Sequence, residues 1–93
     1  MMASRFADKA TEKIADGQFV KSFSGIASRA ERRLDQVIVA ASLSDLRALP
    51  GLRLEALKGD RAGQYSVRIN DQYRVCFEWV DGEAVNIEIV DYH

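Results

Sequence analysis

The feature that most constrains the fold is a change of hydrophobic period near the middle of the chain. Between residues 26 and 41, apolar side chains recur at steps of three and four, which places them along one face of an α-helix. Beyond Pro50–Gly51, which breaks the chain, the period falls to two, as in half-buried strands. A helical half followed by a stranded half predicts an α+β domain with one antiparallel sheet packed against N-terminal helices.

Two helices are expected before the break. Residues 7–16 form the first, with Ala10 and Ile14 on its buried side and Gly17 placed to end it. Residues 24–41 form the second helix. Its charged face is predicted to be solvated, with a docking surface as the alternative. Residues 42–49 can add one or two helical turns. The apolar stripe of the second helix consists of Ile26, Ala30, Leu34, Val37, Ile38 and Ala41.

The second half is predicted to be an antiparallel meander. Asn70–Asp71 and Asp81–Gly82 lie at its two joins and are typical of tight hairpins. Residues 53–57 are expected to add one strand, and residues 3–6 a short one. The side chains expected on the core face are Tyr65, Val67, Ile69, Tyr73, Val75, Phe77, Trp79, Val85, Ile87 and Ile89.

Size and composition bound the function. The chain has 93 residues, of which 47% are apolar, enough for the core of one domain over residues 1–93. No apolar run approaches the roughly 20 residues that span a bilayer, and no export signal is evident, so we expect no membrane association and a cytoplasmic location. Cys76 and His93 are the single cysteine and histidine, so neither an internal disulfide nor a metal site is predicted, and no cofactor is expected.

The charge is unevenly distributed. The net charge is −1, which excludes a general polyanion binder. Residues 47–74 nevertheless carry six Lys or Arg against three acids, whereas residues 75–93 carry five acids and no Lys or Arg. One basic site can therefore come from the middle segment.

The polar face of the predicted sheet is the candidate for such a site. Strict alternation places Arg68 and Arg74 together on it, beside Cys76 and Glu78, with no carboxylate next to the arginines in their part of the hairpin. Two adjacent guanidinium groups favour an anion site. The alternative is an ordinary solvated face with weak cross-strand Arg–Glu pairs.

The last three residues add proton-transfer chemistry. By alternation Tyr92 shares the face of Arg74, while Asp91 and His93 continue the apolar side. Cleavage of an RNA phosphodiester by its own 2′-hydroxyl needs a base, an acid and cations for the charged phosphorane. Asp91 and His93 can handle the protons, and Arg68, Arg74 and Lys58 can supply positive charge.

Other reaction classes fit less well. One histidine gives no convincing Ser-His-Asp set. The segment "GDRAG" at 59–63 lacks the spacing and the Lys-Ser/Thr pair of a phosphate-binding loop. Cys76 lies within a strand among apolar neighbours, which favours a structural thiol over a nucleophile.

Several segments of the sequence resemble one known family. "LRLEALKGDRAGQYSVRINDQYRVCFEW" followed by "VNIEIVDYH" is similar to the killer-protein (HigB) branch of the RelE-type bacterial toxins. "FADKATEKI" and "SLSDLRALPG" extend the resemblance over nearly the whole chain. It implies a compact sheet packed on N-terminal helices and a ribosome-dependent mRNA endoribonuclease that cuts messages in the A site. It also implies a helix-turn-helix antitoxin of the HigA type as partner, with DNA contacted only through that antitoxin.

The resemblance assigns roles position by position. Lys58 and Arg74 would neutralise phosphate, Asp91 and His93 would transfer protons, and Tyr92 would orient or stack on a base. As the RNA-binding residues we add Arg68, Arg53 and Arg61.

Two departures leave an alternative open. Leu49 and Leu52 stand where relatives commonly have Pro and Asn, and Glu55–Ala56 occupy a stretch where some relatives have a histidine. Leu52 would remove a polar side chain from the RNA face. The alternative is a weakly active or inactive binding module that serves as antitoxin partner and co-repressor.

Overall fold

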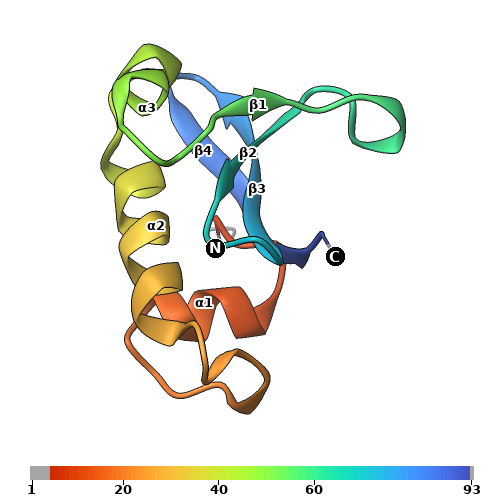
Figure 1. Ribbon diagram of the computed structural model, residues 1–93. Helices are drawn as coiled ribbons and strands as arrows, with labels where there is room; N and C mark the ends of the chain where they lie inside the picture. Colours follow the sequence, from red (N-terminus) through yellow and green to blue (C-terminus); the bar gives the residue numbers. More distant parts are fainter. Residues whose placement is uncertain (1–4, 93) are drawn as a thin grey trace, which may run out of the picture.

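A four-stranded antiparallel sheet with helices on one face forms the body of the molecule (Figure 1). The computed structural model describes residues 5–92. The strands follow in chain order, β1-β2-β3-β4, and the predicted α+β architecture is confirmed. The described elements are α1 (Lys9–Ala15), the 3-10 turn η1 (Lys21–Phe23), α2 (Ala27–Val39), α3 (Leu43–Ala48), β1 (Glu55–Ala56), the 3-10 turn η2 (Gly59–Arg61), β2 (Gln64–Arg68), β3 (Tyr73–Val80) and β4 (Glu83–Asp91).

Helix α1 is fixed at both of its ends and docks on β4. The Asp8 side chain caps it by accepting a hydrogen bond from the Thr11 amide, and Gly17 follows with a left-handed φ of 78°. Thr11 and Ile14 are its buried residues, whereas Ala10 is only half-buried. The Thr11 Oγ1 accepts a hydrogen bond of 3.0 Å from the Ile89 amide, which joins the helix to the sheet.

Helix α2 carries most of the helical contribution to the core. Ala30, Leu34 and Val37 of the predicted stripe are fully buried, and α2 contacts both β3 and β4. The helix ends at Val39, so Ala41 lies beyond it and is exposed. None of the helices within residues 5–92 is long and apolar enough to cross a membrane.

A β-bulge in β4 overturns the predicted facing of Val85. Cys76 pairs with Glu88 and Glu78 with Val85, so two residues of β4 oppose one residue of β3 at this point. Asn86 adopts a left-handed φ of 52° there, which reverses the alternation. Val85 therefore shares the face of Glu78, and Ala84 takes the core position opposite Trp79.

The two hairpin joins differ. Asp81 and Gly82 both have positive φ, which matches the predicted two-residue turn between Val80 and Glu83. The join at Asn70–Asp71 is longer than predicted, since β2 ends at Arg68 and β3 begins at Tyr73. The Asn70 Oδ1 accepts hydrogen bonds from the amides of Gln72 and Tyr73 and so closes this loop.

The remaining strand predictions hold in shortened form. Residues 53–57 contribute only the two-residue β1, extended by a hydrogen bond from the Leu57 amide to the Gln64 carbonyl. Of residues 3–6, the described part forms an isolated parallel bridge between Phe6 and Ile87.

Candidate active site

The face of the sheet away from the helices carries the predicted arginine pair. Arg68 and Arg74 are direct partners across β2 and β3, so their shared face is confirmed. The premise that no carboxylate lies beside them is wrong. Arg68 forms an ion pair with Asp71 of the adjoining loop, and the Arg74 Nη2 lies 3.7 Å from Glu55 Oε1. The acids come from neighbouring segments rather than from across the same hairpin.

Arg74 is the most firmly held of these cations. Its Nε donates to the Ser66 Oγ at 2.7 Å, and its Nη2 donates to the Arg53 carbonyl at 2.8 Å. The side chain is only 12% exposed. Arg53 adopts a left-handed φ of 50°, an unfavourable conformation for a residue with a side chain. The chain thus holds a strained backbone where its carbonyl fixes the Arg74 guanidinium.

Tyr92 lies against Arg74, as the alternation predicts. The Arg74 Cζ is 5.8 Å from the centre of the Tyr92 ring, within the range of a cation–π contact. The Tyr92 amide donates to the Gln72 carbonyl at 2.6 Å, which anchors this end of β4. Tyr92 is 45% exposed, so its ring remains accessible to a ligand.

Asp91 lies on the opposite side of the strand from that contact. It pairs with Tyr73 of β3, and its Oδ2 accepts a hydrogen bond of 3.1 Å from the Gln72 Nε2. His93, the other predicted proton-transfer residue, lies outside the described residues. The structure therefore brings together Arg74 and Tyr92 and places Asp91 next to them along the chain.

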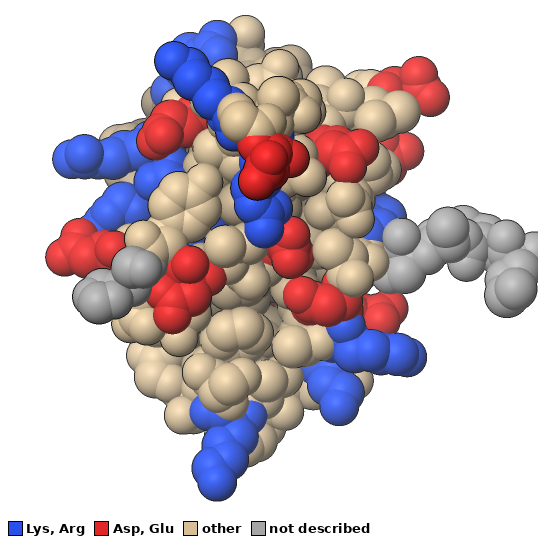
Figure 2. All heavy atoms as spheres, turned by 90° about the vertical axis from the view of Figure 1, so that its right-hand side faces the viewer, with Lys and Arg blue, Asp and Glu red and all other residues tan. Residues whose placement is uncertain are grey.

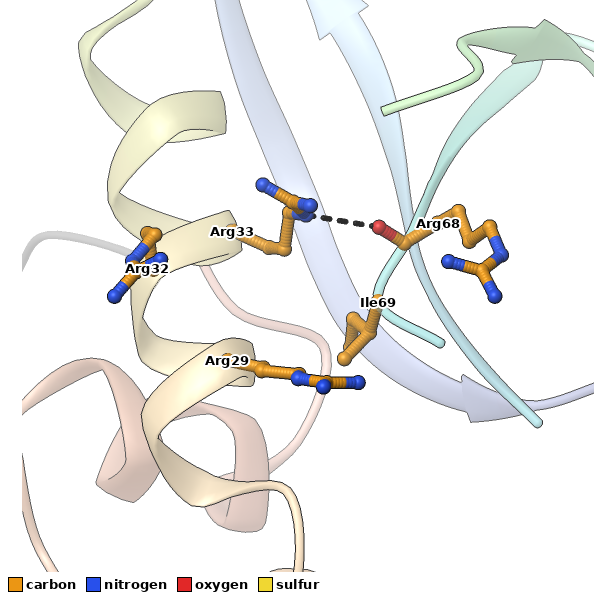
Figure 3. A pocket seen from close by; sticks show the side chains of 5 residues that line it. All are labelled: Arg29, Arg32, Arg33, Arg68 and Ile69. Atoms are coloured by element: carbon orange, nitrogen blue, oxygen red, sulfur yellow. Dashed lines mark hydrogen bonds between the residues drawn. The ribbon is translucent and has the colours of Figure 1, made fainter. Parts of the chain in front are cut away.

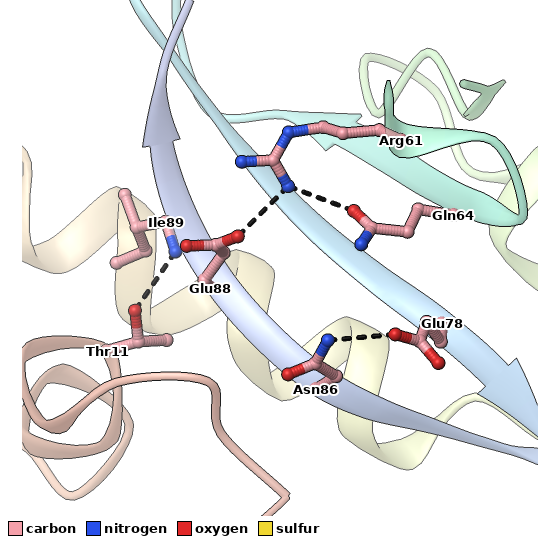
Figure 4. Close-up of polar contacts among 7 residues, drawn as sticks. All are labelled: Thr11, Arg61, Gln64, Glu78, Asn86, Glu88 and Ile89. Carbon is pink, nitrogen blue, oxygen red and sulfur yellow. Dashed lines mark hydrogen bonds and ion pairs between the residues drawn. The ribbon is translucent and has the colours of Figure 1, made fainter. Parts of the chain in front are cut away.

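A second polar group on this face was not predicted from the sequence (Figure 4). Arg61, from the loop between β1 and β2, donates through Nη1 to both Glu88 Oε1 and Gln64 Oε1 at 2.9 Å. This hydrogen bond with Glu88 raises the pKa of Arg61 above its ordinary value. Glu88 stands opposite Cys76 in the ladder. The alternation of the strand places Glu88 on the polar face, so its facing could have been predicted from the sequence. Its pairing with Arg61 could not.

Cys76 lies beneath this polar group. It is fully buried, and burial raises the pKa of its thiol. The nearby guanidinium groups of Arg61 and Arg74 act in the other direction but do not outweigh burial. The thiol stays protonated and inert near neutral pH, which agrees with the predicted structural role.

Lys58 and Arg53 are more exposed to solvent than Arg74. Lys58 immediately precedes η2 in the loop that projects at the upper right of Figure 1, and both side chains are exposed. Within residues 5–92, no ion pair involves either side chain, and no hydrogen bond joins Lys58 to Arg74 or Tyr92. Lys58 is thus exposed on the projecting loop and is not part of the hydrogen-bonded network of Arg74 and Tyr92.

The surface on this side of the molecule has mixed charge. Figure 2 shows acidic and basic side chains interspersed, with no continuous basic patch. Among the residues that the structure describes, no group of three or more His, Cys, Asp or Glu side chains could hold a metal ion. The described cluster thus offers guanidinium groups, a phenol and carboxylates as its chemistry.

Comparison with known proteins decides the family. Residues 4–93 match the model of the RelE-like toxins of type II toxin–antitoxin systems, HigB. The chain belongs to the HigB-like toxin family. Toxin HigB-1 of Vibrio cholerae is 40% identical over 87 residues, which cover 91% of this chain and 92% of that protein. The Endoribonuclease HigB of Proteus vulgaris is 31% identical over 65 residues, or 70% of each chain.

Membership of the HigB-like family confirms the predicted resemblance, and it makes an antitoxin partner part of the system to which the chain belongs. One departure from the family pattern has a different meaning than expected. Leu52 is fully buried among the core residues, so it does not remove a polar group from the sheet face. Leu49 is exposed at the end of α3.

Proposed function

We propose that this HigB-like toxin is an endoribonuclease that cuts mRNA in the A site of the ribosome and thereby arrests translation. The observation that carries the proposal is the exposed Tyr92 ring against an Arg74 guanidinium that Ser66 and the Arg53 carbonyl hold in place. The name of the Proteus vulgaris relative, an endoribonuclease, supports the same activity.

The proposed chemistry is attack of the RNA 2′-hydroxyl on the adjacent phosphodiester. Arg74 stabilises the charge of the phosphorane, because a guanidinium fixed before the reaction needs no rearrangement during it. Tyr92 stacks on a base next to the bond that is cut. Asp91 and His93 transfer the protons, one as the base that takes the 2′-hydroxyl proton and the other as the acid that protonates the leaving oxygen.

The other cations contact the RNA backbone. Arg68 lies across the ladder from Arg74, Arg53 precedes β1, and Lys58 and Arg61 belong to the projecting loop. Three of these five positive groups, Arg61, Arg68 and Arg74, already have carboxylate partners. Such a surface holds free RNA weakly, which supports a mechanism in which the ribosome positions the message.

The proposed partners follow from the family. A helix-turn-helix antitoxin of the HigA type neutralises the protein, and DNA is reached only through that antitoxin. The proposed site of action is the cytoplasm, where ribosomes and mRNA are found. Residues 1–93 are proposed to act as one toxin domain without a cofactor.

Primer extension on an mRNA in a reconstituted translation system tests the proposal. We expect cuts within codons that appear only with both ribosomes and protein. The matched variants are Arg74→Gln, which removes the fixed guanidinium, and Arg47→Gln, which removes one positive charge on α3. An uncut message in the presence of folded, ribosome-bound protein would contradict the proposal.

The alternative is a binding module that serves mainly as antitoxin partner and co-repressor. One of its supports is gone, because Leu52 belongs to the core. Carboxylate pairing of Arg61, Arg68 and Arg74 still favours it. A growth assay separates the two: expression without antitoxin arrests growth if the protein cuts mRNA and is harmless if it only binds.

A further inference from the structure

A cleft lined by arginines lies between α2 and the end of β2 and shares only Arg68 with the candidate active site. Its volume is about 270 Å³. Figure 3 shows the Arg29 side chain reaching from α2 toward Ile69, and Arg33 spanning the gap to the Arg68 carbonyl. The Arg68 guanidinium lies on the other side of its strand. The residues that line the cleft are Arg29, Arg32, Arg33, Arg68 and Ile69.

The positive charge that α2 brings to this cleft is not neutralised by ion pairs within the described chain. Arg33 donates to two neutral oxygens, the Arg68 carbonyl at 3.0 Å and the Gln36 Oε1 at 2.9 Å. Across residues 5–92, none of the ion pairs involves Arg29, Arg32 or Arg33. Burial and the neighbouring arginines lower the pKa of Arg33, which reports the same excess of positive charge.

The helix bears this charge at a cost to its own stability. Arg29 precedes Arg32 by three positions and Arg33 by four, the spacings at which like charges on a helix repel one another. None of the described residues that line the cleft carries a carboxylate. A bound anion would remove the repulsion and would meet planar guanidinium groups that match phosphate oxygens.

We propose that this cleft binds a phosphodiester group of the RNA backbone at a second contact, apart from the bond that is cut. The inference rests on the proposed function. The volume lies just below the range of about 300–1,000 Å³ typical of pockets for whole small molecules, so it suits a single phosphate group.

The position of Arg68 favours RNA over an acidic protein segment. Its carbonyl is held by Arg33 within the cleft, while its guanidinium lies beyond the strand, opposite Arg74 in the ladder. The cleft and the candidate active site thus meet at the end of β2. A single RNA strand that passes around the hairpin end can contact both.

The test measures binding of a short single-stranded RNA whose 2′-O-methyl groups prevent cleavage, at a series of salt concentrations. The variant is Arg29→Gln with Arg32→Gln, which leaves the Arg33 hydrogen bonds in place. The matched control, Lys13→Gln with Arg47→Gln, removes two positive charges elsewhere. We expect several-fold weaker binding for the cleft variant only. The slope of log affinity against log salt should become shallower by about 0.7 for each phosphate that the variant no longer neutralises.

A second variant separates charge from geometry. Arg29→Lys with Arg32→Lys keeps both charges, so the salt slope should stay close to that of the unchanged protein while the affinity falls, because lysine cannot present a planar fork. On ribosomes, the glutamine variant should show a raised KM for the ribosome–mRNA complex that a higher concentration of this complex overcomes. Thermal unfolding of each variant verifies that it is folded.

Three outcomes would overturn the inference. If the cleft variant and the matched control bind RNA equally, the cleft does not contact RNA. The proposed function is still supported in that case if the unchanged protein cuts mRNA on ribosomes. If the cleft variant loses binding to a glutamate-rich peptide but not to RNA, the site serves an acidic protein partner. An unchanged protein that neither binds the RNA nor cuts mRNA on ribosomes would remove the proposed function as well.

Discussion

Two groups of arginines on this molecule are built in opposite ways. On the sheet face, Arg61, Arg68 and Arg74 each have a carboxylate partner, namely Glu88, Asp71 and Glu55. On α2, Arg29, Arg32 and Arg33 have no ion pair within the described part of the chain.

The difference indicates a division of roles. A guanidinium held by acids and carbonyls has a fixed position but little excess charge, so it suits the stabilisation of a reacting group. An unpaired cluster has excess charge, so it suits attraction of a polyanion over a distance. Position and net attraction thus come from different elements of the fold.

The largest expected effect is on Arg74. Replacement by Ala should lower the rate of mRNA cleavage on ribosomes by about 100- to 1,000-fold, the usual cost of removing one donor that stabilises transition-state charge. It also leaves the buried Ser66 hydroxyl without this hydrogen bond, so unfolding should become easier by about 1–3 kcal/mol. Single-turnover primer extension and thermal unfolding measure the two effects.

The Arg74→Lys variant sharpens this result. Lysine keeps the charge but cannot contact both the Ser66 Oγ and the Arg53 carbonyl with a planar fork, so activity should stay low. Full recovery with lysine would mean that only charge matters at this position. The contrast between positioned and unpaired arginines would then fail.

Tyr92 should show the next largest effect. Tyr92→Ala removes a base-stacking surface worth about 1–3 kcal/mol, which corresponds to roughly a 5- to 150-fold loss of cleavage efficiency. Tyr92→Phe keeps the ring over Arg74 and should retain most of the activity. Primer extension at several protein concentrations compares the two. Equal losses for both variants would assign the role to the hydroxyl group instead of to stacking.

The sequence predicts side-chain facing well wherever the period of two is unbroken. The pairing of Arg68 with Arg74 and the contact of Tyr92 with Arg74 both follow from simple alternation. Val85 is the exception, because one left-handed residue at Asn86 reverses the facing on one side of it. A bulge depends on how two strands pair, and the sequence of one strand alone does not determine that pairing.

The carboxylate partners could not be predicted for a related reason. Asp71 and Glu55 approach the arginines from a loop and from a two-residue strand, both set by tertiary packing. The buried position of Leu52 is of the same kind, since a leucine after a Pro–Gly break gives no periodic signal. The arginine cleft likewise needs the spacing between α2 and β2, which only the folded chain provides.

Glu88→Gln tests whether pairing limits attraction. The change removes a negative charge from the sheet face and weakens the hold on Arg61, so Arg61 becomes more like the arginines of α2. We expect tighter RNA binding by a few-fold together with slower cleavage of bound message. Stability should change by less than about 1 kcal/mol, because the pair is partly exposed. Salt-dependent binding of the uncleavable RNA and single-turnover cleavage measure the two.

The control for this change is Glu83→Gln, which removes a carboxylate paired with Arg5 at the far end of β4. It should alter neither RNA binding nor cleavage. If Glu88→Gln raises both the affinity for RNA and the cleavage rate, then the fixed position of Arg61 does not contribute to catalysis.

The effect that is absent at neutral pH concerns Cys76, which lies under the paired arginines. Burial raises the pKa of its thiol, so the folded protein keeps the proton at a pH where the unfolded chain loses it. Below about pH 8.5 both states are protonated and the thiol has no influence on stability. Above that value the unfolded state binds fewer protons, so the free energy of unfolding should fall, by at most about 1.4 kcal/mol per pH unit.

The Cys76→Ala variant should lack this contribution, and denaturant unfolding between mildly and strongly alkaline pH compares the two slopes. Parallel slopes would mean that the thiol ionises within the fold, and that Arg61 and Arg74 attract an anion beneath them despite their carboxylate partners.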